Sequence, residues 1–259
     1  MSSLVHTEIM TGSPEYGNWV GRKFIYAPGL AGVVFLGLGL FLPALLFAAG
    51  LFFLFTAYFA YARYLFAPRG GNVQDRIVEL ILAHLDWNGE GRALDIGCGN
   101  AAVTVKLAQK YPRARIVGID YWGGGWEYSK EMCERNARTE KVIDRVSFQK
   151  ASASSLPFAD GYFDAVVSNL VFHEVRGVPD KREVVREALR VVRKGGSFAF
   201  QDLFMFRRIY GDMDDFLAAI RSWGIERVEF VETRNAPFIP RMLKLPFMVA
   251  TMSLIAGEK

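Results

Sequence analysis

The chain has 259 residues, 51% of them hydrophobic, and 31 lysines and arginines against 27 acids give a net charge of +4. This positive excess is too diffuse for a nucleic-acid interface, which gathers basic residues on one surface, so we expect no nucleic-acid partner. The two cysteines, Cys98 and Cys133, have neither CxxC spacing nor a nearby histidine, and the sequence therefore indicates neither a metal site nor a disulfide framework.

The first predicted element is a long apolar stretch, residues 24–62, which contains no charged residue and no His, Asn or Gln. As one helix it would be roughly 58 Å long, about twice the hydrocarbon core of a bilayer. Pro43 divides it into two segments, 24–42 and 44–62, which predicts a two-helix transmembrane hairpin over residues 24–66. A hairpin that dips into the bilayer without reaching the far side fits equally well. A buried hairpin of a soluble protein is a weaker alternative, because apolar runs of this length are rare there.

Basic residues flank the stretch on both sides, whereas the turn has none (Arg22, Lys23, Arg63 and Arg69). Because basic flanks favour the cytoplasmic side, both ends of the hairpin are expected there. The sequence therefore predicts a multi-pass protein of the cell membrane, with a cytoplasmic N-terminal segment at residues 1–23 and a cytoplasmic domain at residues 67–259.

The remainder alternates short apolar runs with amphipathic stretches, which predicts an α/β fold of parallel strands crossed by helices. Helices are expected at residues 73–85, 101–111, 127–142 and 180–194, and strands at residues 92–97, 115–120, 145–151, 163–170 and 196–203. Two final strand-like runs, 227–233 and 247–257, are separated only by a proline-rich stretch and predict an antiparallel edge. That stretch, residues 235–246, mixes basic and apolar residues, as either a membrane-touching loop or an ordinary surface loop does.

The most specific motif is LDIGCGNAA, residues 94–102, in which a strand runs into glycines and then into a helix. Glycines let backbone N–H groups approach a ligand at the helix N-terminus. Asp120 closes the next strand, where an acid accepts hydrogen bonds from ribose hydroxyls. The pattern therefore predicts a cofactor that contains a nucleoside.

The same spacing also satisfies the dinucleotide fingerprint, so a nicotinamide-dependent oxidoreductase is an alternative. Asp95 argues against it, because a carboxylate two residues before Gly97 repels a pyrophosphate and attracts an ammonium group. The amino-acid half of S-adenosylmethionine carries such a group. A non-catalytic, membrane-tethered module that binds the cofactor is a third interpretation.

From about residue 72 onward the chain resembles class I S-adenosylmethionine-dependent methyltransferases, in the broad group of ubiquinone and sterol methyltransferases. LDIGCGN is similar to the family's first motif, IVGIDYW to its second, and SSLPFADGYFDAVVSNLVFHEV to its fourth with the approach to it; RVVRKGGSFAFQDL matches the stretch that enters the fifth strand. The resemblance implies a methyltransferase domain at residues 67–259, with a Rossmann-like seven-stranded sheet whose last strand is antiparallel.

The resemblance also implies the cofactor contacts. Asp95, Gly97 and Gly99 would hold the methionine moiety and Asp120 the ribose. Where the family has an Asp that contacts the adenine amino group, this chain has Ser152, which is shorter and uncharged. The remaining expected cofactor residues lie beside these at the strand ends (Cys98, which fills the loop, Asn100, Tyr121, Trp122, Ala153, Asn169 and Leu170).

Residues just beyond the fourth strand lie beside the transferred methyl group in this fold, which makes His173 and Glu174 the candidate catalytic residues. If the acceptor is a hydroxyl or an acidic carbon, His173 is suited to act as the base, and its alternative role is to cap or pack the strand end. The glycines at 123–125 would permit a mobile flap. We expect transfer of a methyl group to a lipophilic or membrane-associated acceptor, such as a quinone precursor or a lipid; the sequence identifies neither the methylated atom nor the oligomeric state.

Overall fold

The computed structural model describes residues 12–123 and 128–259. The chain divides into two compact units. The sheet unit contains residues 81–232 and 251–259 together with the described residues before Gly17, and the hairpin unit contains Gly17–Leu80 and Thr233–Ala250.

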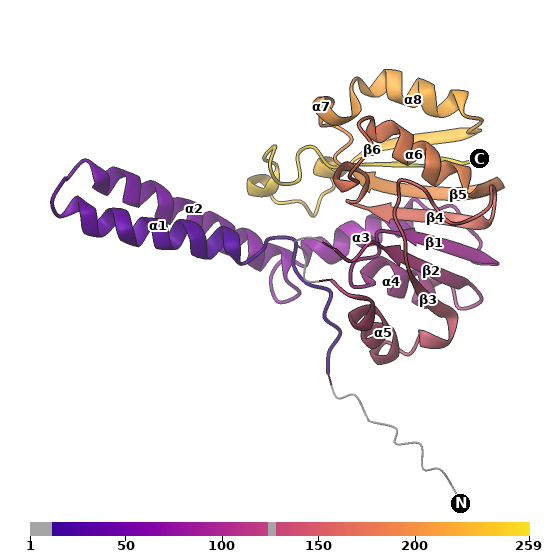
Figure 1. The fold of residues 1–259 in the computed structure, drawn as a ribbon, viewed down its shortest axis with the longest axis horizontal. Helices are drawn as coiled ribbons and strands as arrows, with labels where there is room; N and C mark the ends of the chain where they lie inside the picture. The colour runs from indigo at the N-terminus through magenta and orange to yellow at the C-terminus, as the bar shows by residue number, and fades with distance from the viewer. Residues whose placement is uncertain (1–11, 124–127) are drawn as a thin grey trace, which may run out of the picture. The chain divides into compact units, whose positions relative to one another are not determined.

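The centre of the sheet unit is a seven-stranded sheet in the order β3-β2-β1-β4-β5-β7-β6 (Figure 1). Strands β1 to β5 run parallel, whereas β7 is antiparallel to both β5 and β6. The predicted Rossmann-like sheet with an antiparallel last strand is confirmed. The strands are β1 (Arg92–Ile96), β2 (Arg115–Asp120), β3 (Val146–Lys150), β4 (Phe163–Asn169), β5 (Val192–Asp202), β6 (Arg227–Glu232) and β7 (Ser253–Glu258).

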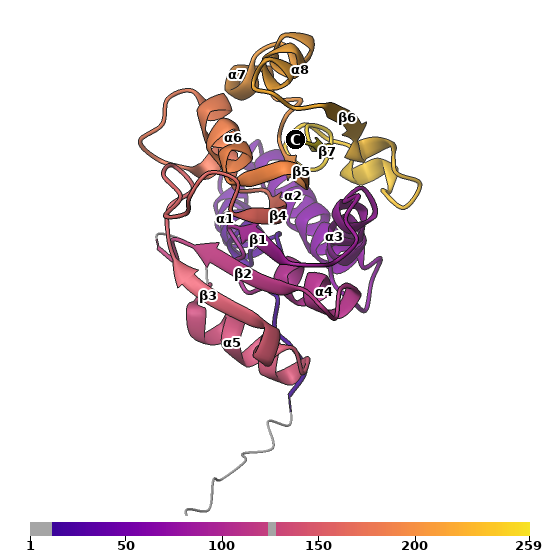
Figure 2. The ribbon, with the colours of Figure 1, turned by 90° about the vertical axis from the view of Figure 1, so that its right-hand side faces the viewer.

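Helices cover both faces of this sheet, and Figure 2 shows α4 and α6 on opposite sides of it. The core between the layers includes fully buried aromatic side chains such as Phe163, Phe198 and Phe200. Strand order reverses between β1 and β4, and in open α/β sheets ligands bind at the carboxyl ends of the strands beside such a reversal. The helices are α3 (Val73–Ala83, at the boundary of the two units), α4 (Ala102–Lys110), α5 (Lys130–Thr139), α6 (Lys181–Arg190), α7 (Arg207–Tyr210) and α8 (Met213–Ser222).

Three expectations about the elements need correction. The helix predicted to run to Lys194 ends at Arg190, and β5 begins at Val192, so the glycine pair 195–196 lies inside a strand. The pairing of β5 shifts there, because Phe163 pairs with Val192 but the next pair joins Ala165 and Ser197. The last strand is shorter than predicted, and α7 and α8 were not predicted.

The hairpin unit is built on two antiparallel helices, α1 (Lys23–Gly39) and α2 (Leu45–Phe66), joined by a turn that contains Pro43. Rings face each other across the pair: Phe35 stacks on Phe52 with centroids 5.3 Å apart. A Cβ on Gly32 would lie 2.8 Å from the ring of Phe53, so glycine permits the close approach of the helices. The predicted hairpin and its turn at the proline are present.

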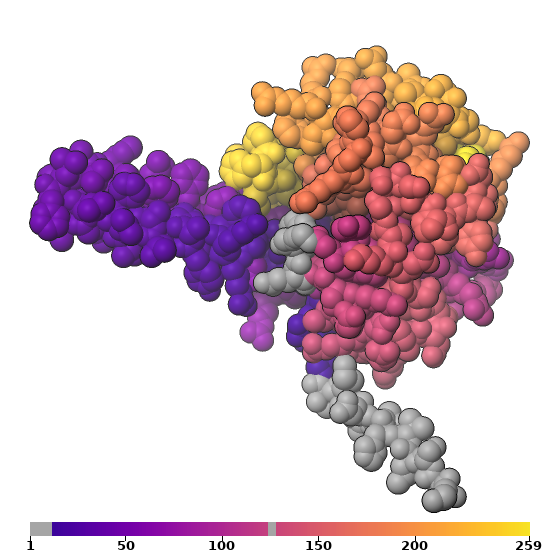
Figure 3. Space-filling view, in the orientation of Figure 1, coloured from indigo at the N-terminus to yellow at the C-terminus, as the bar shows by residue number. Residues whose placement is uncertain are grey.

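Many outward side chains of this hairpin, which is drawn in indigo and purple in Figure 3, are large and apolar. Phe41 is 89% exposed and Phe47 82%. Among the described helices α2 alone, with 22 residues, is long and apolar enough to cross a membrane. Helix α1 has 17 residues and is about 26 Å long, because residues 40–44 form the turn and do not extend the helix. Two membrane-spanning helices are therefore not confirmed.

Candidate cofactor and catalytic site

The glycine loop follows β1 and leads into α4. Gly97 and Gly99 have φ values of +70° and +55°, in the left-handed region that favours glycine. A Cβ on Gly97 would lie 2.0 Å from Cγ2 of Val171, so no larger residue fits. The N–H groups of Gly97 and Cys98 both donate to the carbonyl of Ile119, at 2.8 and 2.9 Å. The loop is therefore fixed between β2 and the segment after β4, and burial raises the pKa of the Cys98 thiol inside it.

Asp95 lies in β1 directly before this loop and is 1% exposed. Its Oδ2 accepts a hydrogen bond of 2.6 Å from the Thr104 hydroxyl, whereas Oδ1 has no hydrogen-bond partner among the described residues. Burial raises the pKa of Asp95 to about 7; the bond from Thr104 opposes this rise and the charge of Asp120 adds to it. A buried oxygen without a partner is costly, so Asp95 fits a ligand that brings an ammonium group.

Asp120 ends β2 and lies next to the loop. Its carboxylate accepts hydrogen bonds from the N–H groups of Gly99, at 2.9 Å, and Trp122, at 2.8 Å. The indole N–H of Trp122 donates to the carbonyl of Gly99 at 3.0 Å, so this side chain folds against the loop. Carboxylate oxygens have further lone pairs, and Asp120 therefore remains able to accept bonds from ribose hydroxyls.

Asn100 makes contacts that hold the loop in place. Its amide donates to the carbonyl of Glu15 at 3.3 Å, and its Oδ1 accepts the N–H of Ser129. The amide of Asn136 in α5 bridges the carbonyls of Asn100, at 2.9 Å, and Glu15, at 3.1 Å. Asn100 thus joins the glycine loop to α5 and to the segment around residue 15, a link that the sequence did not reveal.

The other predicted adenine-side residues follow β2 and β3. Tyr121 is 64% exposed, and the ammonium of Lys150 lies 5.2 Å from its ring centroid. The Ser152 hydroxyl bonds to that of Ser154 at 2.8 Å and accepts the N–H of the same residue. Ala153 packs into the core. The structure therefore leaves Tyr121 accessible, engages Ser152 in a local turn and withdraws Ala153 from the surface.

Beyond β4 the chain turns sharply. Asn169 ends the strand, and its Oδ1 accepts a long bond of 3.4 Å from the Gln201 amide. Leu170 has a backbone φ of +60°, which residues other than glycine rarely adopt. Its N–H donates to the Gln201 carbonyl at 2.7 Å. Strained non-glycine residues of this kind concentrate at functional sites. The turn leads into a short 3₁₀ helix, Phe172–Glu174, which carries the predicted catalytic residues.

His173 is paired with an acid that the sequence analysis missed. Its Nδ1 lies 2.6 Å from Oδ1 of Asp202, the fully buried last residue of β5, whose Oδ2 accepts the N–H of Phe172 at 2.7 Å. Burial disfavours the charged imidazole, but the hydrogen bond and charge of Asp202, helped by Glu174, outweigh burial and raise the pKa of His173. The sequence did contain a signal for this contact. Asp202 ends β5, which pairs with β4, and β4 leads to the segment that carries His173.

The hydrogen bond also defines the ring's tautomer. With Nδ1–H donating to Asp202, Nε2 of His173 keeps its lone pair and can accept a proton. Nε2 lies 3.8 Å from Oε1 of Glu174, which is 45% exposed at the side chain. The pair of His173 and Asp202 therefore has the geometry of an oriented general base.

Tyr128 connects the two halves of the site and was also missed. A Cβ on Gly99 would lie 3.4 Å from its ring. Burial raises the pKa of Tyr128 to about 12, and the charges of Glu174 and Asp120 add to the rise. The phenol therefore remains neutral beside the loop. The predicted flap falls largely on Gly124 and Gly125, which lie outside the described residues.

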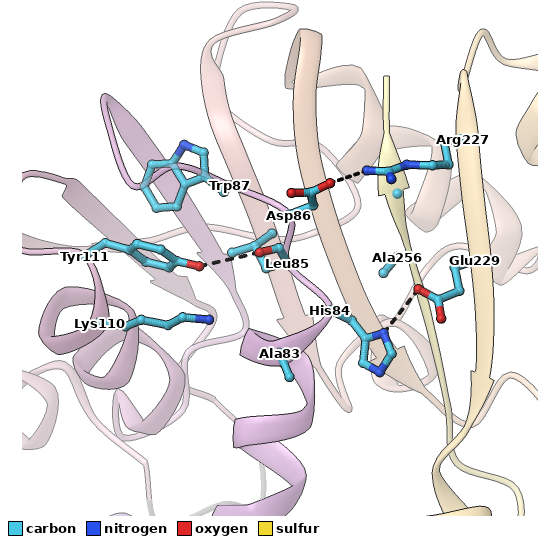
Figure 4. Close-up of a pocket in the computed structure, with 11 residues that line it drawn as sticks. Ala83, His84, Leu85, Asp86, Trp87, Lys110, Tyr111, Arg227, Glu229 and Ala256 are labelled. Atoms are coloured by element: carbon cyan, nitrogen blue, oxygen red, sulfur yellow. Dashed lines mark hydrogen bonds and ion pairs between the residues drawn. The ribbon is translucent and has the colours of Figure 1, made fainter.

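A cavity of about 440 Å³ lies elsewhere in the sheet unit, beside the start of β6 (Figure 4). Two pairs form among its titratable side chains, Arg227 with Asp86 at 2.5 Å and His84 with Glu229 at 3.2 Å, whereas Lys110 donates to the carbonyl of Leu82. None of the predicted site residues lines it. This cavity is therefore separate from the candidate cofactor site at the glycine loop.

Comparison with known families decides the kind of domain to which this site belongs. Residues 94–200, from β1 through most of β5, match the family model described as "Methyltransferase domain". This part of the chain is similar to methyltransferase domains. The match supports the predicted class I, S-adenosylmethionine-dependent methyltransferase over these residues.

Curated relatives of the methyltransferase domain share about a third of its residues. Methyltransferase GfsG of Streptomyces halstedii is 32% identical over 146 residues, which is 56% of this chain and 48% of that protein. Ubiquinone/menaquinone biosynthesis C-methyltransferase UbiE of Geotalea uraniireducens is 30% identical over 129 residues, 46% of this chain and 51% of that protein. The chain thus spans about half the length of the curated relatives that it matches.

Solved structures agree on the fold of the methyltransferase domain. Geranyl diphosphate C-methyltransferase from Streptomyces coelicolor superposes with a TM-score of 0.55 at 15% identity, covering 71% of this chain and 79% of that one. The [4+2]-cyclase SpnF superposes with a TM-score of 0.51 at 20% identity, covering 71% and 78%. Because one of these proteins is named as a cyclase, the likeness establishes the fold, and the reaction must be argued from the site.

Proposed function

We propose that this chain is a membrane-associated methyltransferase that moves a methyl group from S-adenosylmethionine to a lipophilic acceptor, such as a quinone precursor or a lipid. The observation that carries the proposal is the exposed apolar hairpin joined to a methyltransferase domain in one chain. Exposed patches of this size mark interaction or membrane surfaces, because water penalises them. Holding a catalytic domain at the bilayer raises the effective concentration of substrates that partition into lipid.

The cofactor assignment within this proposal rests on complementary charge. Asp95 offers a buried oxygen without a hydrogen-bond partner among the described residues, which suits the ammonium group of the methionine moiety. Asp120 would accept the ribose hydroxyls, and the glycine loop leaves room for close approach of the ligand. When bound, S-adenosylmethionine supplies an electrophilic methyl group on a positively charged sulfur.

The chain's own residues then have two tasks, orientation and proton removal. Methyl transfer is an in-line displacement, so most of the acceleration comes from alignment and from exclusion of water. His173 would take the acceptor's proton on Nε2, while Asp202 holds the ring in place and stabilises the resulting imidazolium. Glu174 lies close enough to add to that stabilisation.

The choice of acceptor follows from the hairpin and is consistent with the relatives. Those relatives include proteins named for ubiquinone and menaquinone biosynthesis and for geranyl diphosphate methylation. We propose the cell membrane as the location, with residues 1–23 and 67–259 on the cytoplasmic side, because basic residues flank the hairpin at both ends.

The test is transfer of radiolabel from methyl-labelled S-adenosylmethionine, catalysed by the full chain reconstituted in membranes of its source. We expect label in the organic extract, in a species that migrates as a lipid or quinone precursor. Label confined to protein or to water-soluble products would contradict the lipophilic acceptor.

A matched pair of histidine variants tests the mechanism. His173→Gln should lower kcat by roughly 10²- to 10⁴-fold with little change in cofactor affinity, because it removes the base but not the cofactor contacts. His84→Gln alters a histidine that bonds to Glu229 away from the site and should leave kcat unchanged. Equal activity of the two variants would exclude His173 as the base.

Asp202→Asn separates positioning from proton removal. Since Asp202 raises the pKa of His173, its replacement should shift the acidic limb of the kcat profile to lower pH. A fall in kcat without this shift would indicate that Asp202 acts only on the fold.

A further inference from the structure

The hairpin unit contains a segment from the far end of the chain. Residues 233–250, here called the collar, cluster with the hairpin although β1 to β6 separate them in sequence. The collar includes two short 3₁₀ helices, Thr233–Asn235 and Arg241–Leu243, and has three basic residues and no acid. Apart from Thr233 and Asn235, its side chains are therefore basic or apolar.

The collar is attached to one level of α2. The Tyr58 hydroxyl donates to the carbonyl of Met242 at 3.1 Å. The ring of Phe247 contacts those of Tyr58 and Phe59, with centroids 5.9 and 6.3 Å away. Phe59 in turn stacks on Phe24 at the start of α1, with centroids 5.4 Å apart. The collar thus packs on the end of the hairpin where the chain enters and leaves.

The collar's outer side has the composition of a membrane interface. Leu243 and Val249 are fully buried and fix the segment, whereas Phe247 is 61% exposed. Arg241 and Lys244 are exposed as well, and neither forms an ion pair within the part of the chain that the structure describes. Exposed aromatic rings beside basic side chains suit the headgroup layer of an anionic bilayer.

The opposite end of the hairpin is suited to hydrocarbon. The turn, residues 40–44, is wholly apolar. The N–H groups of Phe41 and Leu42 both donate to the carbonyl of Leu38 at 3.0 Å, and that of Leu45 donates to Leu42 at 3.0 Å. With the Leu40 N–H, which donates to the Gly37 carbonyl at 3.3 Å, three of the four N–H groups of the turn are bonded internally, as suits a turn inside hydrocarbon, where no water is present.

The length between these two levels limits how deep the hairpin reaches. From Leu45 to Tyr58 α2 rises about 20 Å at 1.5 Å per residue. The hydrocarbon core is about 30 Å thick, so this length exceeds one leaflet and falls short of two. A hairpin held at Tyr58 by the headgroups would therefore end inside the bilayer.

We propose that the collar binds the anionic phospholipid headgroups of one leaflet and so holds the hairpin as a re-entrant anchor whose apolar turn ends within the hydrocarbon. This rests on the membrane association proposed above and specifies its geometry. The lipid is recognised by charge through Arg241 and Lys244, and by the interfacial ring of Phe247. The anchor would enter and leave the bilayer on the same side.

The test uses the full chain reconstituted in vesicles with a fluorescent label on one introduced cysteine, since Cys98 and Cys133 are buried. We compare Phe247→Cys in the collar, Phe41→Cys in the turn and Ser222→Cys on the exposed end of α8. Lipids with a nitroxide high or deep in the acyl chain then report depth. We expect shallow quenching at 247, deep quenching at 41 and none at 222.

Each outcome separates this proposal from the broader one. Deep quenching at 41 with a water-exposed label at 247 overturns the collar while leaving membrane association intact. A label at 41 that is reached by iodide trapped inside the vesicles shows a full crossing and overturns the re-entrant geometry. Failure of both labels to be quenched removes the membrane association itself.

Charge recognition has its own pair of variants. In the Phe247→Cys background, Arg241→Gln with Lys244→Gln should raise the fraction of phosphatidylglycerol needed for half-maximal quenching by roughly twofold or more. Lys194→Gln with Arg221→Gln removes the same charge from exposed positions in the sheet unit and should have no such effect. Identical titrations of the two double variants would contradict headgroup binding by the collar.

Discussion

The two units of this protein treat apolar side chains in opposite ways. Of the 22 large hydrophobic residues that are exposed among those described, 18 lie between Phe24 and Tyr64 and only three lie in the sheet unit. The sheet unit buries most of its aromatic residues and has acidic side chains at the candidate site at the carboxyl ends of its parallel strands. This difference is what we expect if the hairpin faces a bilayer, as proposed above, and the sheet unit faces water.

Deleting the same ring from each unit is the strongest test of this contrast. Phe163 is fully buried, so Phe163→Ala should lower the free energy of unfolding by about 3–5 kcal/mol through lost burial and a cavity. Phe47 is 82% exposed, so Phe47→Ala should change it by less than about 0.5 kcal/mol. Urea unfolding of the full chain in detergent, followed by tryptophan fluorescence, measures both. Equal losses would mean that the hairpin helices are buried against protein.

Asp95→Asn should increase the stability of the sheet unit and weaken its binding of S-adenosylmethionine. The folded-state pKa of about 7 lies above the ordinary 3.8, so ionisation destabilises the fold progressively as pH rises from about 4 to 7. At pH 8 the variant without cofactor should gain roughly 2–4 kcal/mol and lose measurable binding of S-adenosylmethionine. Thermal unfolding and calorimetry check the two effects. The control is Asp215→Asn, at an exposed site on α8, which should change neither.

The glycine loop can be compared with a glycine that has the same backbone but open surroundings. Gly97→Ala places a Cβ 2.0 Å from Val171 at φ +70° and should cost about 2–3 kcal/mol. Gly177→Ala has φ +79° and brings its Cβ within 4 Å of no described atom, so it should cost only about 1 kcal/mol. Urea unfolding measures the difference. If the losses are equal, Val171 yields and the loop is looser than its geometry indicates.

Thr104→Val should produce the smallest effect and refine the role assigned to Asp95. Affinity for S-adenosylmethionine should rise about tenfold per pH unit below the pKa of Asp95 and level off above it, because the ionised acid binds the ammonium group. The hydrogen bond from Thr104 lowers that pKa, so its loss should move the break to higher pH. Calorimetric titrations between pH 5.5 and 9 locate the break. An unmoved break would separate Asp95 from the pH dependence.

Local signals in the sequence predicted most of the fold. Three features could be predicted from residues adjacent in sequence, and all three are present: the strand before Gly97, the acid at the end of β2 and the helices on either side of Pro43. The predicted end of the helix at Lys194 was wrong. Basic and apolar residues alternate at the start of β5 much as they do along the preceding helix, so the sequence does not mark where one ends and the other begins. The register shift beside Gly195 depends on pairing with β4, which no local pattern records.

The site was predicted incompletely for the same reason. Asp95 and Asp120 belong to recognisable motifs, whereas Asp202 and Tyr128 reach the site from elements distant in sequence. Glu15 accepts the hydrogen bond from the Asn100 side chain on its backbone carbonyl, so the identity of residue 15 does not signal the contact. Residues that contribute through contacts distant in sequence could therefore be identified only from the structure.

The carboxylate that ends β5 has a consequence for how this enzyme would change. One of its oxygens anchors the imidazole and the other anchors the main chain that leads to the ring, so neither can move independently. New acceptors would then have to be accommodated by the walls around the base, since the base itself has no freedom to be re-aimed. Variation in substrate choice should therefore appear in side chains that border His173 and spare the acid behind it.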